Sequence, residues 1–187
     1  MTNTEFSMTD ADRVLAFWFD ELEPKQHFIQ SAALDCQIRE RFIDLHQAAV
    51  ACELWLWRTS AKGRLAEVIV LDQFSRNIYR NQVQAFKGDE LALCLAQEAI
   101  SLGLDQVLEP FMRSFLYMPF MHSESKVIQT QSVRLFEAPG METNLNFALR
   151  HREIVDRFGR YPHRNEALGR ESTAEELAFL CEPGSSF

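Results

Sequence analysis

Two charged residues interrupt the apolar face of a helix predicted over residues 63–79. Leu65, Val68, Asp72 and Arg76 follow one another at intervals of three or four residues, so they share one side of an α-helix. Asp72 and Arg76 are one turn apart on the side that packs against the rest of the protein. A carboxylate and a guanidinium at this spacing are able to form an ion pair, and we expect both to be drawn into the interior.

Two further predicted helices carry histidines and a carboxylate at or near their apolar faces. His122 and Glu124 lie near the start of a helix predicted over residues 120–136, and His151 lies among the apolar positions of one predicted over 143–158. Histidine titrates near neutral pH, and a carboxylate beside it can orient the imidazole ring. These three residues are therefore the candidates for proton transfer.

A basic run lies between residues 157 and 165, with the sequence Arg-Phe-Gly-Arg-Tyr-Pro-His-Arg-Asn. Gly159 can end one helix and Pro162 can begin another, which leaves backbone N–H groups free to bind an anion. Arginines that cap helix ends and bridge helices would give the same pattern, and this alternative stays open. The candidate anion-binding side chains of this run are Arg160, His163, Arg164 and Asn165.

The polar residues on these helices are expected to meet in one cluster. Burying an unpaired polar group costs about 1 to 3 kcal/mol, and a lone charge costs more, so the buried groups should find one another. We predict a partly buried pocket for a small anionic ligand, with possible hydrolytic or proton-transfer chemistry. The predicted catalytic residues are His122, Glu124 and His151, and the predicted ligand-binding residues are Asp72, Gln73, Arg76, Asn77, Arg160, His163, Arg164 and Asn165.

Two other interpretations of the same residues remain open. A stack of helix pairs can bind a peptide in a concave groove, where Asn77, Asn165 and Arg164 would hold a terminal carboxylate without any catalysis. Alternatively, every polar group is satisfied inside the protein and the cluster has only a structural role. An open groove would favour peptide binding, whereas a closed pocket with perturbed histidine and glutamate residues would favour chemistry.

The sequence gives little support to other kinds of site. His122, Glu124, His151, His163 and Asp72 are acceptable metal ligands, but no HExxH or ExxH spacing is present, so no metal site is predicted. GxSxG, Walker and GxGxxG motifs are also absent from the sequence, and no cofactor is indicated.

Helical periodicity extends over most of the chain and predicts an all-α fold. Linkers rich in Gly, Pro or Ser are absent, so residues 1–187 are expected to form one compact domain. Helices are predicted over residues 11–19, 34–49, 63–79, 89–102, 110–117, 120–136, 143–158 and 173–181. A short turn is predicted near residues 162–168.

The net charge bears on the class of partner, and the cysteine spacing bears on the cellular location. The 187 residues carry a net charge of -8, which disfavours nucleic acids, and no apolar run approaches the length needed to cross a bilayer. The first twelve residues lack the order of a signal peptide, and the four cysteines lie far apart, so we expect a cytoplasmic protein with reduced thiols. The sequence does not indicate the oligomeric state.

Four segments together resemble the family known as domain of unknown function 924. They are residues 14–19, 71–77, 117–124 and 157–165 together with 168–173, with the sequences VLAFWF, LDQFSRN, YMPFMHSE, and RFGRYPHRN with LGREST. The resemblance implies a helical fold similar to tetratricopeptide stacks of antiparallel helix pairs. Ser75 and Met121 depart from the family pattern, where proline and an acidic residue are usual. The implied site positions are Asp72, Gln73, Arg76, Asn77, His122, Ser123, Glu124, His151, Arg157, Gly159, Arg160, Pro162, His163, Arg164 and Asn165.

Overall fold

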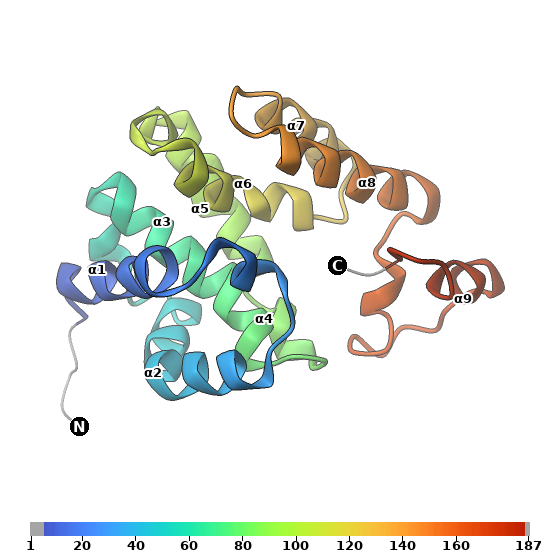
Figure 1. Ribbon diagram of the computed structural model, residues 1–187, viewed down its shortest axis with the longest axis horizontal. Coiled ribbons are helices and arrows are strands. Elements are labelled where there is room, and N and C mark those ends of the chain that lie inside the picture. The colour runs from blue at the N-terminus through green and yellow to red at the C-terminus, as the bar shows by residue number, and fades with distance from the viewer. Residues whose placement is uncertain (1–5, 186–187) are drawn as a thin grey trace.

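The computed structural model describes residues 6–185 and contains helices but no strands in that range. This arrangement confirms the all-α class, while the tetratricopeptide-like stack and the single domain stay predictions. Figure 1 shows α1 to α4 on one side of the molecule, α7 to α9 on the other, and α5 and α6 between them. The α-helices are α1 (Met8–Ala16), α2 (Ala32–Val50), α3 (Ala61–Ile69), α4 (Ser75–Ile78), α5 (Asp89–Ser101), α6 (Pro110–His122), α7 (Lys126–Phe136), α8 (Glu142–Phe158) and α9 (Ala174–Leu180).

The helix predicted over 120–136 begins later than expected, and this prediction was wrong. Helix α6 continues through Pro119 to His122, and α7 begins only at Lys126. Proline removes one backbone hydrogen bond from a helix, but the residues around Pro119 are buried, and their packing offsets that loss. His122 consequently lies at the C-terminal end of α6 instead of in the first turn of a helix, and Glu124 lies in the connection to α7.

The helix predicted over 63–79 is present but contains a π-helical segment, Val70–Phe74, between α3 and α4. This wider turn carries Asp72, and side chains from the next turn bind its carbonyl groups. Ser75 Oγ donates a hydrogen bond to the Leu71 carbonyl at 2.6 Å, and Arg76 Nη1 donates one to the Asp72 carbonyl at 2.6 Å. Such π-helical turns occur frequently at functional sites, which is consistent with the position of Asp72.

A large apolar core connects α1 through α8 and fixes the helices that carry the polar cluster. The rings of Phe17, Trp18, Phe42, Phe74 and Phe115 are fully or almost fully buried, and their centroids lie 4.9 to 6.0 Å apart in successive pairs. Aromatic pairs at such distances add to the stability that burial already provides. Because Phe74 is the last residue of the π-helical turn, this packing holds the segment that contains Asp72.

The chain leaves α8 at Gly159, which has a φ of 72° in the left-handed region that favours glycine. A short 3-10 turn, Pro162–Arg164, and helix α9 follow, and Figure 1 shows this segment beside α8. Thr173 and Glu176 form a reciprocal capping box at the start of α9. Tyr161 is fully buried between this segment and the body of the protein, so the basic run is anchored.

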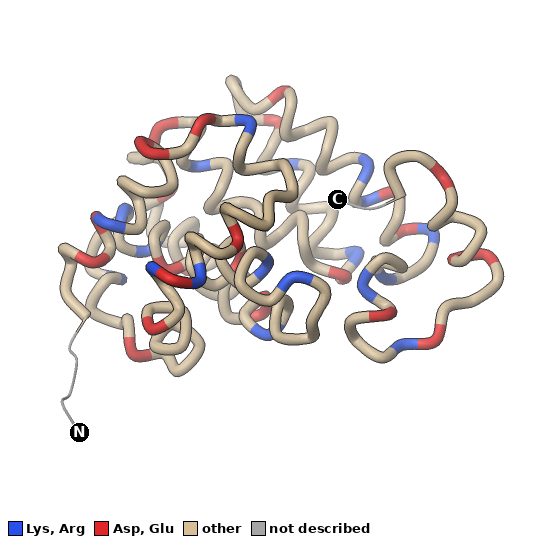
Figure 2. The backbone as a smooth tube through the Cα atoms, turned by 60° about the horizontal axis from the view of Figure 1, so that its bottom comes forward, with Lys and Arg blue, Asp and Glu red and all other residues tan. Residues whose placement is uncertain are grey.

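Charges of both signs are distributed along the whole described chain, as Figure 2 shows. No helix within residues 6–185 has both the length and the apolar character that crossing a membrane requires.

Candidate functional site

His122 and Asp72 form the centre of the polar cluster. His122 Nδ1 lies 2.7 Å from Asp72 Oδ1, although the two residues are 50 positions apart in the sequence. Asp72 is fully buried, whereas His122 keeps 16% of its side chain exposed. Helix α6 supplies the imidazole from its C-terminal end and the π-helical turn supplies the carboxylate. A buried carboxylate that touches one ring nitrogen fixes the orientation of the histidine.

Two more side chains hold the Asp72 carboxylate in place. Arg76 Nη1 lies 3.3 Å from Asp72 Oδ1, which confirms the ion pair predicted from their spacing. Gln73 Nε2 donates a hydrogen bond to Asp72 Oδ2 at 2.6 Å. Burial opposes the ionisation of Asp72, but the charge of Arg76 and the contact with His122 outweigh it, so the pKa of this carboxyl lies well below its usual range.

The surroundings of His122 favour a neutral imidazole with a defined tautomer. Burial lowers the pKa of His122, and the opposing attraction of Asp72 does not compensate for it. An ionised carboxylate can only accept hydrogen bonds, so we assign the imidazole proton to Nδ1, which donates to Asp72. Nε2 then carries a lone pair, and it makes no hydrogen bond to any residue in the range 6–185. This nitrogen is able to accept a proton.

Asp89 connects Arg76 to Arg164. Arg76 holds both carboxylate oxygens of Asp89, at 2.9 and 3.0 Å, whereas Arg164 makes one longer contact to Asp89 Oδ2 at 3.3 Å. The Arg164 guanidinium also donates to the His122 carbonyl at 2.9 Å. It lies 4.8 Å from the ring centroid of Phe86 and 4.6 Å from that of Tyr161, a contact that suits a planar cation.

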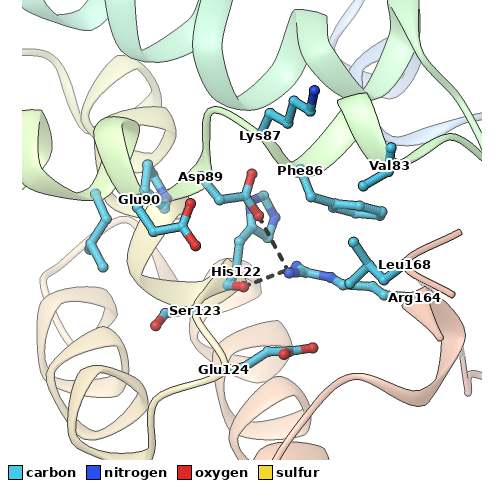
Figure 3. A pocket seen from close by; sticks show the side chains of 12 residues that line it. Val83, Phe86, Lys87, Asp89, Glu90, His122, Ser123, Glu124, Arg164 and Leu168 are labelled. Carbon is cyan, nitrogen blue, oxygen red and sulfur yellow. Dashed lines mark hydrogen bonds and ion pairs between the residues drawn. The ribbon is translucent and has the colours of Figure 1, made fainter. Parts of the chain in front are cut away.

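A cavity of about 410 Å³ opens beside these groups and is partly open to solvent. Figure 3 shows Asp89, His122 and Arg164 close together, with Phe86 and Leu168 beside Arg164 and the Lys87 side chain directed away from it. The volume falls within the range that small-molecule sites occupy. The lining residues are Val83, Phe86, Lys87, Asp89, Glu90, Leu93, Pro119, His122, Ser123, Glu124, Arg164 and Leu168.

Glu124 lines the cavity and joins it to the C-terminal segment. Both carboxylate oxygens accept hydrogen bonds from Arg170, at 2.7 and 2.9 Å, and one also accepts the backbone N–H of Tyr161 at 2.8 Å. Partial burial opposes ionisation, but these donors lower the pKa of Glu124. A carboxylate that is ionised and occupied by three donors is better suited to positioning the segment than to giving up a proton.

His151 and His163 are close to the cluster but do not line the cavity. The His151 ring lies 6.2 Å from that of His122 and 5.6 Å from that of Tyr161, and its Nδ1 lies 2.8 Å from the Phe147 carbonyl. Burial, with help from the nearby cationic or titratable groups, lowers the pKa of His151 to about 3 and that of His163 to about 4. Both are therefore neutral at pH 7.

The other predicted ligand-binding residues have partners outside the cavity lining. Asn77 faces away from it and donates to Asp35 at 2.8 Å. Arg160 forms a two-pronged ion pair with Glu176, at 2.6 and 2.8 Å. Asn165 donates to Ser172 and accepts from Arg170 Nε at 2.9 Å. Of the eleven predicted site residues, the cavity lining contains His122, Glu124 and Arg164, and Asp72, Gln73 and Arg76 lie directly behind His122 and Asp89.

The described residues contain no group of three or more His, Cys, Asp or Glu side chains arranged to hold a metal ion. The ligand types considered in the sequence do come near one another, but the carboxylates of Asp72 and Glu124 are bound to guanidinium groups instead.

Three residues that shape the site were not singled out from the sequence. Asp89 bridges Arg76 and Arg164. Phe86 lies beside the guanidinium of Arg164, and Arg170 holds the carboxylate of Glu124. Acidic residues are ordinary in the first turn of a helix, so nothing marked Asp89 as more than a helix start. Arg170 lies in the last of the four segments that resemble the family, and this was the available signal.

Comparisons with known proteins agree with this picture of the fold. The family model described as "Bacterial protein of unknown function (DUF924)" matches residues 14–184. The chain belongs to the DUF924 family. This DUF924 chain is also similar to a solved structure titled "Structure of Protein of Unknown Function ATU0120 from Agrobacterium tumefaciens", with 39% identity and a TM-score of 0.89. The match covers 94% of the DUF924 chain and 99% of that protein. No curated protein matches the chain.

Proposed function

We propose that the cavity binds a small molecule with an anionic group and that His122 transfers a proton to or from it. The observation that carries this proposal is the contact between His122 Nδ1 and the buried Asp72 carboxylate, which leaves Nε2 available as a base beside the cavity. The chemistry would be hydrolysis, with His122 activating a water molecule, or proton transfer at the ligand itself.

The position of Asp72 supports a catalytic role for the histidine. A carboxylate that accepts the Nδ1 proton fixes the tautomer and stabilises the imidazolium ion that forms when Nε2 takes a proton. Burial at this place keeps His122 neutral and therefore ready to act as a base near pH 7. Arg76 and Gln73 keep the carboxylate ionised and oriented throughout this cycle.

Arg164 is the best candidate to hold the anionic group. It lines the cavity, its contact with Asp89 is longer than an ordinary charged hydrogen bond, and Lys87 on the rim is directed away from it. The guanidinium also donates to the carbonyl of His122, so an anion bound there would lie next to the proton acceptor. Phe86, Leu93 and Leu168 would cover the apolar part of such a ligand.

Ligand-dependent thermal stability tests the binding part of the proposal. Purified protein is heated in phosphate, acetate, citrate or adenosine monophosphate, with sodium chloride at equal ionic strength as the reference. We expect at least one anion to raise Tm in the wild type, and Arg164→Gln to abolish that rise. Arg160→Gln is the matched control, because Arg160 lies in the same segment but binds Glu176 outside the cavity. Equal responses of the two variants would contradict the assignment.

Chemical modification tests the proton acceptor. Diethyl pyrocarbonate acylates neutral, accessible imidazole nitrogens, so peptide mapping should find His122 modified before the buried His46 and His151. An anion that raises Tm should slow this modification. Preferential modification of His46 or His151 over His122 would show that Nε2 of His122 is not the available base.

We also propose a cytoplasmic site of action. Cys36, Cys52, Cys94 and Cys181 are all exposed and free of disulfide bonds, a state that a reducing compartment maintains.

A further inference from the structure

Asp89 has an unusual position for an ordinary structural acid. Its carboxylate lines the cavity, lies between the guanidinium groups of Arg76 and Arg164, and belongs to the first residue of helix α5. Two guanidinium groups and the positive end of a helix dipole therefore surround one carboxylate. The same combination of charges would hold the carboxylate of a ligand equally well.

The two contacts of Asp89 differ in quality. Arg76 binds it through two parallel hydrogen bonds at 2.9 and 3.0 Å, whereas Arg164 reaches only one oxygen at 3.3 Å. Arg164 is 7% exposed, and within the described chain its Nε–H has no hydrogen-bond partner. A buried guanidinium with a long ion-pair contact and an unpaired donor is incompletely satisfied, and a second anion would improve its environment.

The charges around Arg164 also favour the binding of a second anion there. Burial and the nearby charge of Arg76 lower the pKa of Arg164, which means that its positive charge is poorly compensated in this state. Arg76, by contrast, has a raised pKa, because Asp72 and Asp89 outweigh the effect of burial.

We propose that Asp89 occupies the anion subsite of the cavity in the ligand-free protein, and that a ligand carboxylate binds by taking over its contact with Arg164. This inference rests on the proposed function in its anion-binding part and adds the class of anion. Asp89 is a planar carboxylate that fits between the two guanidinium groups, so a carboxylic acid should fit better than a tetrahedral phosphate. Asp89 thereby sets the affinity of the site and selects for carboxylates.

Chemical rescue tests this inference on the full-length protein. Asp89→Ala removes the carboxylate and leaves a hole of about its size, which formate can fill. Tm is measured for the wild type and the variant over a series of sodium formate, acetate and phosphate concentrations, with sodium chloride as the reference. We expect the formate concentration for half-maximal stabilisation to fall about tenfold in Asp89→Ala, the equivalent of one charge-assisted hydrogen bond. Formate should act at lower concentration than phosphate.

Asp35→Ala is the matched control. Asp35 is also held by two hydrogen bonds from one arginine, Arg80, and its side chain is 17% exposed compared with 15% for Asp89. It lies away from the cavity, and among the described residues no second guanidinium is hydrogen-bonded to it, so the formate concentration for half-maximal stabilisation of Asp35→Ala should equal that of the wild type. An equal formate response in both variants, or an unchanged half-maximal concentration in Asp89→Ala, would overturn the inference.

Two further outcomes are decisive. If Asp89→Ala folds in formate but not in chloride, the rescue itself supports the subsite. If it folds in neither salt, Asp89→Asn, which keeps the shape and removes the charge, must show the gain in formate affinity, and failure there refutes the proposal. A gain in Asp89→Ala beside a wild type that responds to no anion would refute the proposed function alone. If the wild type binds anions but neither Asp89→Ala nor Asp89→Asn binds formate more tightly, only this inference is refuted.

Discussion

The stability of this protein should fall as the pH is lowered below about 6.5, and His151 should account for a measurable share of the loss. Burial lowers the pKa of His151 from an ordinary value of 6.5 to about 3, so the unfolded chain binds a proton in this range that the folded protein does not. The neutral side chain therefore contributes its full stability above pH 6.5, and the contribution declines as the pH falls toward 3.

The magnitude follows from the width of that pH window. Between pH 6.5 and pH 5 the difference amounts to 1.5 pH units at about 1.4 kcal/mol per unit, or about 2 kcal/mol. The replacement His151→Gln removes the titrating group and costs some stability at pH 7, because the ring packs against Tyr161 and His122. At pH 5 the wild type has lost about 2 kcal/mol of its His151 contribution, so the gap between the two proteins should narrow by the same amount.

Urea unfolding at pH 7, 6 and 5 measures this gap directly. Ile154→Ala is the control, because Ile154 is buried on the same helix but does not titrate, and its gap to the wild type should stay constant over this range. The other buried histidines affect the wild type and both variants alike, so they cancel in the comparison. A His151→Gln gap that is the same at pH 7 and pH 5 would show that His151 accepts a proton in the folded protein without penalty.

The ion pair of Glu124 and the conformation of two glycines give further predictions. Glu124→Gln leaves the Arg170 guanidinium without its paired carboxylate, so the free energy of unfolding should drop by about 2 kcal/mol, and limited proteolysis should cut the segment after Gly159 sooner than in the wild type. Cleavage at unchanged rates would contradict this role of Glu124. Gly159→Ala should cost about 1 kcal/mol in thermal unfolding, because φ is 72° while a Cβ would meet no atom within 4 Å. Gly63→Ala should cost more, since its Cβ would collide with the Trp57 carbonyl, and the reverse order would refute the strain argument.

Local sequence patterns were sufficient for much of the helical architecture. Apolar residues at helical spacing predict the element over 63–79, and the same spacing places Asp72 and Arg76 one turn apart, where the structure has their ion pair. The capping pair Thr173 and Glu176 was likewise visible, because a capping box involves residues only three positions apart. These features depend on backbone geometry within one or two turns, which the sequence specifies locally.

The end of α6 could not be derived in this way. Proline usually interrupts a helix, and the sequence accordingly predicts separate helices over 110–117 and 120–136, on either side of Pro119. The helix continues because the residues on both sides of Pro119 are buried in the core, and that burial comes from other helices. The five residues beyond the predicted end at 117 carry His122 to the position from which its ring reaches Asp72.

Sequence alone determined that the chain is helical and that charged groups on apolar faces had to find partners, because burying an unpaired charge is too costly. Only the tertiary structure decided which partners they found. The partners lie far apart in the sequence: 50 positions separate His122 from Asp72, 75 separate Arg164 from Asp89, and 46 separate Glu124 from Arg170. Helical periodicity fixes the face on which a side chain lies, but the energy of an ion pair depends on distance and burial, and these arise only when distant helices pack together.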